Sequence, residues 1–275
     1  MLKITAFIKR HPVPAYYVLV FAISWGCILL ALGPAGFLGT GQTSSLQLYV
    51  GGPLSLLGPS VAGVFMTGLI YGKAGLRDLL SRLFRWRVGG GWYTAALLTA
   101  PLLTTGLILM LSLTPAIVTA SDKASLLVFG FAIGLIVPFF EELGWTGFAI
   151  PEIRKRHGIL ATGLIMGLLW GVWHFPIFSA SAGSSGSIQP AIYLAVLLFS
   201  WLIPYRVLIV WVYDHTHSLL VAMLMHAPIV IDQFVLLPQV LSGTLLMTYL
   251  LLFTTALWII VIVAMLRRQP LPQPV

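Results

Sequence analysis

The chain has 275 residues, of which 59% are hydrophobic and only 8% are charged, and its mean hydropathy is +1.01. A soluble domain carries about 25% charged and about 45–50% apolar residues, so this composition excludes a soluble globule, a disordered chain and a nucleic-acid-binding protein. The net charge is +8, and the single cysteine excludes a disulfide within the chain. We therefore interpret the chain as a polytopic membrane protein.

Eight apolar segments are long enough, at about 20 residues each, to cross the hydrocarbon core of a bilayer. They cover residues 15–37, 46–71, 92–117, 124–148, 159–179, 189–213, 217–238 and 242–266. No internal repeat or low-complexity linker separates them, so we expect one all-α domain over residues 1–275, a membrane helical bundle. Between the second and third segments, apolar residues recur every three or four positions from Leu76 to Phe84, which predicts a basic interfacial helix.

The basic residues predict the orientation of this bundle, because lysine and arginine are enriched in cytoplasmic loops. With eight spans, thirteen of the fifteen basic residues fall on one side and Lys123 falls opposite. Both termini are therefore expected in the cytoplasm, with the first span a retained signal-anchor in a bacterial plasma membrane. Arg206 lies inside a span, where we expect its side chain to snorkel towards the basic side.

A few ionisable residues lie inside the predicted spans, where each costs several kcal/mol. They are Glu141, Glu142, His174, Arg206, His226 and Asp232. A carboxylate beside a histidine is suited to activating water. The same residue types also form buried ion pairs that hold helices together, or proton relays. Polarity alone leaves these alternatives open.

Three motifs carry a resemblance to a known family. They read EELGWTGFAIPEIRKRHG from Glu141, LLWGVWHFPIF around His174 and SLLVAMLMHAPIV around His226. Residues 126–232 strongly resemble the CPBP family, the CAAX-protease and bacteriocin-processing (Abi-like) group of intramembrane endopeptidases. The second family motif has an aromatic residue four positions before the histidine, and here Trp170 stands in place of the usual phenylalanine.

Two positions depart from the family motifs. Thr146 stands where the first motif has arginine, so any salt bridge from that arginine to Glu142 is missing. The candidate cations to replace it are Arg154, Arg156 and Arg206. Val230 stands where the third motif has asparagine, and it has no hydrogen bond to donate to an oxyanion. Asp232 and Gln233 follow closely but are expected on other parts of the helix.

The resemblance implies an endopeptidase that hydrolyses a peptide bond of a membrane-associated protein or peptide. It implies that Glu141 and His174 activate water and that His226 stabilises the oxyanion, with Glu142 and Trp170 in supporting positions. Glu141, His174 and His226 are also a ligand set of the kind that holds zinc, so metal dependence stays open. We favour the metal-free version, because no carboxylate is evident behind a ligating histidine.

The span limits conflict with this assignment. Counted along the helices, Glu141 lies nearer the cytoplasmic face, whereas His174 lies nearer the opposite face. The two residues converge only if the helix that carries His174 begins well below the membrane surface, at Pro151.

The sequence also offers alternatives to an endopeptidase of this kind. A catalytically impaired scaffold or bacteriocin-immunity-like protein that binds partner helices is favoured by Thr146 and Val230, and a transporter is disfavoured because no repeat is present. The GxSG string at 183–186 lies in a loop of small residues, where a serine nucleophile is not expected. Asp214, His215 and His217 are expected to form a solvated turn rather than a metal site.

Overall fold

The computed structural model describes the chain except residues 1, 42–43, 180–184, 239–240 and 267–275. This part of the chain folds into helices without strands, which confirms the predicted all-α membrane bundle. Six helical segments are long and apolar enough to cross a bilayer: 12–37, 50–83, 90–110, 123–154, 190–216 and 243–266. The predicted fifth and seventh spans are the shorter helices α9 (Ile159–Trp173) and α13 (Leu219–Val235), so the count of eight is approximate.

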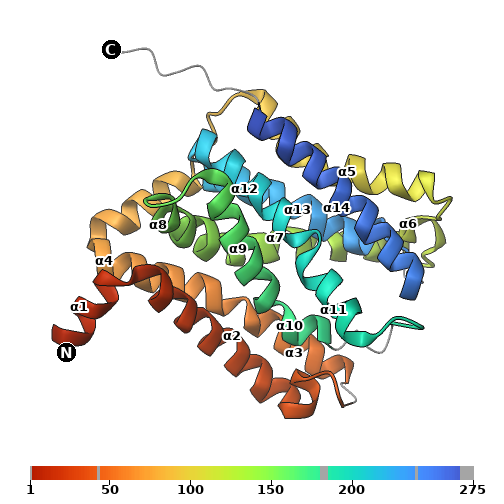
Figure 1. Cartoon of the computed structure of the whole chain (residues 1–275), viewed down its shortest axis with the longest axis horizontal. Coiled ribbons are helices and arrows are strands. Elements are labelled where there is room, and N and C mark those ends of the chain that lie inside the picture. The colour runs from red at the N-terminus through yellow and green to blue at the C-terminus, as the bar shows by residue number, and fades with distance from the viewer. Residues whose placement is uncertain (1, 42–43, 180–184, 239–240, 267–275) are drawn as a thin grey trace.

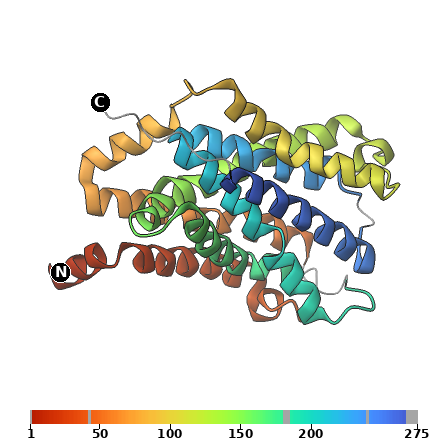
Figure 2. The ribbon, with the colours of Figure 1, turned by 45° about the horizontal axis from the view of Figure 1, so that its top comes forward.

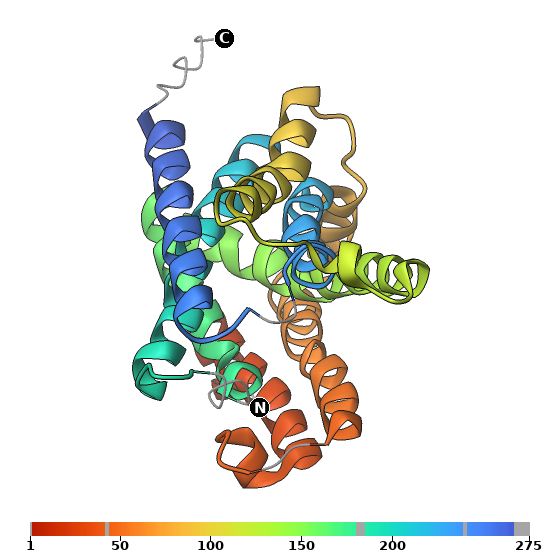
Figure 3. The same cartoon turned by 90° about the vertical axis from the view of Figure 1, so that its right-hand side faces the viewer.

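Four helices form the centre of the bundle: α7 (Lys123–Gly144), α9, α12 (Leu202–Thr216) and α13. The α9 helix lies along α12, and α13 lies along α7 (Figures 1 and 2). The other elements are α1 (Leu2–Arg10), α2 (Pro12–Phe37), α3 (Ser45–Ser55), α4 (Leu57–Leu83), α5 (Gly90–Met110), α6 (Ala116–Thr119), the π-helical turn η1 (Trp145–Ala149), α8 (Ile150–Arg154), α10 (Phe175–Ser179), α11 (Pro190–Phe199) and α14 (Gly243–Leu266). The α2 and α3 helices lie at the opposite end of the molecule from α5 (Figure 3).

A stripe of small residues fixes α9 against α12. Gly163, Gly167 and Gly171 recur at four-residue spacing on one face of α9. A Cβ atom at Gly163 would lie 2.5 Å from the Cα atom of Val207, and one at Gly167 would lie 2.6 Å from the Cα atom of Ile203. Only glycine allows the two backbones to approach this closely. The stripe therefore sets the position of the end of α9, which leads to His174, relative to α12.

The predicted interfacial helix is the last part of α4. Gly72, with φ of 62°, breaks the helical backbone, and the chain then continues in a new direction as far as Leu83. Leu79 is buried against α13, whereas Leu80 and Phe84 are exposed. The segment therefore exists as a helix, and its location at a lipid surface stays a prediction, as does the sidedness of the bundle.

Candidate active site

The helical segment that carries Glu141 is longer than predicted, and this length resolves the conflict between the depths of Glu141 and His174. The α7, η1 and α8 elements form one continuous helical segment that ends at Arg154, six residues beyond the predicted span. Glu141 therefore lies thirteen residues, roughly 20 Å, from the end of that segment. His174 lies fifteen residues, roughly 22 Å, from the start of α9 at Ile159. The two side chains reach the same depth, so the prediction that they lie near opposite faces is wrong.

A cavity of about 410 Å³ brings the three candidate catalytic residues together. Glu141 of α7, His174 at the end of α9 and His226 of α13 all line it. The rest of its wall is mainly apolar, with Pro53 of α3 and Ile136 of α7 among the lining residues. Three polar side chains from separate helices thus share one cavity in an otherwise apolar bundle.

Two tryptophans hold the carboxylate of Glu141. The indole Nε1 of Trp145, one helical turn further along, donates to Oε2 at 3.1 Å, and Nε1 of Trp170 donates to the same oxygen at 2.8 Å. Both donors use Oε2, so within the described part of the chain Oε1 has no such donor and is available to a water molecule. Trp145 is itself fixed, because its ring stacks on Tyr17 of α2 with the centroids 5.7 Å apart.

A buried ion cluster lies behind the cavity and is centred on Glu142. Nη1 of Arg206 lies 2.9 Å and 3.0 Å from the two carboxylate oxygens, and Nδ1 of His226 lies 2.8 Å from Oε1. The hydroxyl of Thr146 donates to Oε2. Glu142 and Arg206 are both 0% exposed. We refer to Glu142, Arg206, His226 and Thr146 as the Glu142 cluster.

Arg206 forms its ion pair with Glu142 inside the bundle. Its side chain does not snorkel, because the carboxylate of Glu142 offers it a full countercharge inside the bundle. It also supplies the cation that the motif lacks at Thr146. Arg154, the other candidate with a described partner, instead forms a two-point ion pair with Asp214.

Trp170 lies between the polar groups of the site. Its ring face covers the guanidinium of Arg206, with 4.0 Å between the guanidinium carbon and the ring centroid. The rings of His174 and His226 meet it edge-on, each with centroids 5.2 Å apart. The carbonyl oxygen of Trp170 lies 2.8 Å from Nδ1 of His174. A carbonyl only accepts, so Nδ1 carries a proton and Nε2 of the neutral ring is free to accept one.

The preference for a metal-free site stays a prediction. Among the residues that the structure describes, no three His, Cys, Asp or Glu side chains are close enough to hold a metal ion. Oε2 of Glu141 is occupied by two indole donors, and Nδ1 of His226 faces Glu142. The expectation that no carboxylate stands behind a histidine is wrong, since Glu142 stands behind His226. In the second region considered for a metal, the carboxylate of Asp214 forms an ion pair with Arg154.

The polar residues after His226 lie differently from the prediction. Val230 and Gln233 both line the catalytic cavity, whereas Asp232 lines a neighbouring one. Gln233 is seven residues, or about two turns, from His226, so the expectation that it points elsewhere is wrong, and the spacing alone was sufficient to place it. Gly183 and Ser184 of the GxSG string lie outside the described residues.

Sequence reasoning underrated two residues. The motifs give no role to Trp145, although its one-turn spacing from Glu141 allows the hydrogen bond that it makes. Arg206 was one of three candidate partners for Glu142. The sequence left these three open, and the isolation of Arg206 as a cation inside an apolar helix is the signal that could have distinguished it.

Comparisons with known proteins give matches to the segment that contains the three motifs. A family model for type II CAAX prenyl endopeptidase Rce1-like proteins matches residues 123–231. A curated relative, CAAX prenyl protease 2 of Methanococcus maripaludis, is 28% identical over 101 residues. That alignment spans 36% of this chain and 37% of the length of the relative. This segment contains all three motifs together with Glu141, His174 and His226, and through it the chain is similar to the CPBP family.

Proposed function

We propose that the protein is an intramembrane endopeptidase that hydrolyses a peptide bond of a membrane-associated protein or peptide. The observation that carries the proposal is the convergence of Glu141, His174 and His226 on one cavity. An ionisable side chain in a membrane helix is costly and is typically retained for function. The name of the curated relative, a CAAX prenyl protease, agrees with peptide-bond cleavage.

Glu141 is the proposed general base. A water molecule between Oε1 of Glu141 and Nε2 of His174 donates one hydrogen to each of them. Glu141 takes one proton, and the resulting hydroxide attacks the carbonyl carbon of the scissile bond. The two indole donors keep the carboxylate in a single orientation, which favours attack along one direction.

His226 is the proposed oxyanion donor. Glu142 stays ionised because it is paired with Arg206, so it can only accept a hydrogen bond from Nδ1 of His226. Nε2 then donates to an oxyanion when the ring is protonated. The positive charge of Arg206 offsets the negative charge of Glu142, and a protonated His226 offsets Glu141. The net charge of these four buried side chains is then zero. A positioned donor of this kind is worth a few kcal/mol in a cavity without bulk water.

Collapse of the tetrahedral intermediate breaks the carbon–nitrogen bond. The leaving nitrogen takes the proton that Glu141 received from water, so the hydroxyl group ends on the new carboxylic acid and one hydrogen ends on the amine. Glu141 is regenerated as a carboxylate. This sequence uses only groups of the chain and one water molecule.

The test compares the termini of membrane peptides from cells that express the wild type, Glu141→Gln or Asp78→Asn as an exposed control. New termini should appear with the wild type and the control and vanish with Glu141→Gln, which keeps the size of the side chain but loses the base. His174→Ala and His226→Ala should act alike, and double variants should be barely worse, because the residues act as a unit. A chelator should leave cleavage intact.

Full biological function in Glu141→Gln would overturn the proposal. It would favour the scaffold or immunity-like alternative, in which the cavity binds a partner helix without cleaving it.

A further inference from the structure

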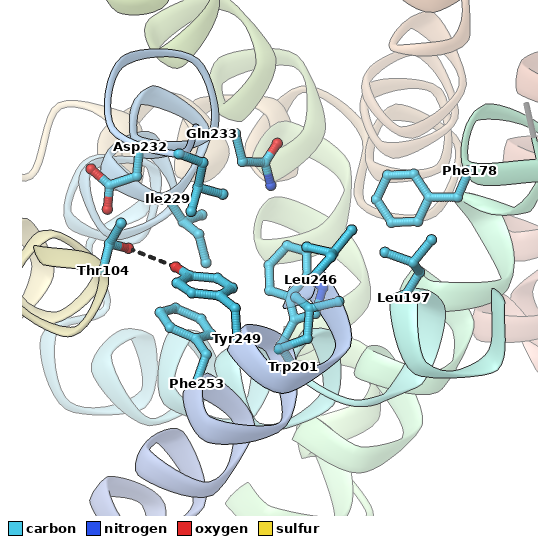
Figure 4. A pocket seen from close by; sticks show the side chains of 12 residues that line it. Thr104, Phe178, Leu197, Trp201, Ile229, Asp232, Gln233, Leu246, Tyr249 and Phe253 are labelled. Atoms are coloured by element: carbon cyan, nitrogen blue, oxygen red, sulfur yellow. Dashed lines mark hydrogen bonds between the residues drawn. The ribbon is translucent and has the colours of Figure 1, made fainter. Parts of the chain in front are cut away.

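A second cavity adjoins the catalytic one and is shown in Figure 4. Its volume is about 180 Å³, below the roughly 300–1,000 Å³ of a typical ligand pocket, so it has room for a single side chain. The two cavities share four lining residues: Phe178, Trp201, Ile229 and Gln233. A substrate bound in the catalytic cavity can therefore extend into the smaller one.

Asp232 gives this cavity a polar end. It is 4% exposed, and its Oδ2 atom has no hydrogen-bond partner. Thr104 of α5 lies at the same end of the cavity and accepts from the hydroxyl of Tyr249 at 3.3 Å (Figure 4). Among the described residues, no lysine, arginine or histidine forms an ion pair with Asp232. Asp232 thus differs from Glu142, whose buried charge is fully matched.

Apart from the amide of Gln233, the rest of the cavity is mainly apolar. Figure 4 shows Asp232, Thr104 and Tyr249 together at one end, with Phe178 and Leu197 at the other. A long hydrocarbon chain with a cationic head matches such a shape, because its methylene groups cover apolar walls while the head reaches the carboxylate. Lysine and arginine side chains have this form.

We propose that the cavity is a substrate subsite that binds a lysine or arginine side chain, with Asp232 as its countercharge. The inference rests on the proposed endopeptidase function and names a feature of its substrate. His226 and Asp232 are six residues apart on α13, which is roughly 9 Å along the helix. An extended peptide covers that length in about three residues, so the recognised residue lies within about three positions of the bond that is cleaved.

The effect of Asp232→Asn on thermal stability distinguishes a substrate-binding role of Asp232 from a structural one. A buried charge without a partner destabilises a fold, so Asp232→Asn should leave the thermal stability of the purified protein unchanged or raise it. If Asp232 instead held the helices together, the same substitution would lower the melting temperature.

The test uses the full-length protein in lipid vesicles and a library of quenched fluorescent peptides. Each peptide carries lysine, arginine, glutamate or the uncharged lysine analogue norleucine at one position. The wild type should cleave lysine and arginine peptides at least tenfold more efficiently than norleucine peptides at one position near the cut. This selectivity ratio should fall about tenfold or more in Asp232→Asn, because the charged hydrogen bond is lost. Asp78→Asn, which alters an acid outside both cavities, should keep the ratio.

A second measurement does not need cleavage. An uncleaved lysine peptide should raise the melting temperature of Glu141→Gln more than its norleucine counterpart does, and this difference should vanish when Asp232→Asn is added. Cleavage without a cationic preference, or an equal preference in Asp232→Asn, would overturn the subsite but leave the endopeptidase intact. Absence of cleavage in the wild type, equal to Glu141→Gln, would overturn the proposed function. Equal binding of both peptides would then overturn the subsite as well.

Discussion

The Glu142 cluster and a second polar cluster, at the ends of α4, α8 and α12, use the same residue types in opposite surroundings. In the second, which we call the surface cluster, Arg154 pairs with Asp214 and Lys155 pairs with Glu152. The side chains of Arg154 and Asp214 are 27% and 23% exposed, whereas those of Arg206 and Glu142 are 0% exposed. Water can replace a lost partner in the Arg154–Asp214 pair but not in the buried Arg206–Glu142 pair. We therefore expect similar substitutions to have very different effects.

The two regions also differ in the cavities that they line. The surface cluster borders a cavity of about 540 Å³, with Arg82, Lys155 and Glu152 in its wall. The catalytic cavity is smaller, at about 410 Å³, and most of its wall is apolar. Electrostatic interactions are stronger in a small apolar cavity. Cavity volume alone would therefore have pointed to the surface cluster rather than to the cavity that Glu141 lines.

The largest effect is expected for Arg206→Met. It leaves the charge of Glu142 buried without its guanidinium partner, which costs about 3–5 kcal/mol of stability. Thermal unfolding of the purified protein should show this loss as a greatly lowered melting temperature. Adding Thr146→Arg should restore much of it, because that position lies one turn from Glu142 and is where the family motif has arginine. If the double variant were no more stable than Arg206→Met, the two positions would not be interchangeable.

Trp170→Phe should have the next largest effect. It keeps an aromatic ring but removes one of the two donors to Glu141, so kcat should fall about tenfold while KM changes little. Trp173→Phe is the matched control, since Trp173 lines the same cavity and its Nε1 has no hydrogen-bond partner. Equal losses in both variants would mean that ring volume, not the hydrogen bond, matters.

Val230→Asn should produce a gain. Val230 lines the cavity one turn after His226, and an amide there would add a second oxyanion donor. We expect kcat to rise by up to about tenfold. A loss of activity in a variant with an unchanged melting temperature would mean that another group, such as Gln233, already serves the oxyanion.

The Arg154–Asp214 pair should matter much less. Asp214→Asn removes a partly exposed partner, and exposed pairs contribute about 0.2–1 kcal/mol. The loss of stability should shrink further between low and high salt, because salt screens such pairs. A change as large as that of Arg206→Met would contradict the comparison between the two clusters.

The smallest effect is expected at Lys155. Partial burial lowers the pKa of Lys155, but hydrogen bonds to Glu152 and Tyr71 outweigh it, and the pKa is raised above its usual value. Its contribution to stability is therefore fully present below the usual lysine pKa and is lost as the pH rises through the raised value. Lys155→Met should remove this dependence, which pH-resolved thermal unfolding measures; an unchanged profile would assign the dependence to another group.

The sequence by itself determined the membrane bundle and the residues of the site. Long apolar runs leave helices as the structure able to satisfy the backbone in lipid, and ionisable residues inside those runs stood out because each is costly there. The acids and histidines of the three motifs were identifiable from the sequence alone.

Only the tertiary structure decided how these residues meet. The depth of Glu141 depends on the π-helical turn that carries α7 on to Arg154, and hydropathy does not mark the point where a helix leaves the membrane. The choice of Arg206 over Arg154 as the partner of Glu142 follows from the glycine stripe, which brings α9 onto α12. Asp232 has no counterion among the described residues. Pairing depends on which helices face one another, and that is set by contacts between residues distant in sequence.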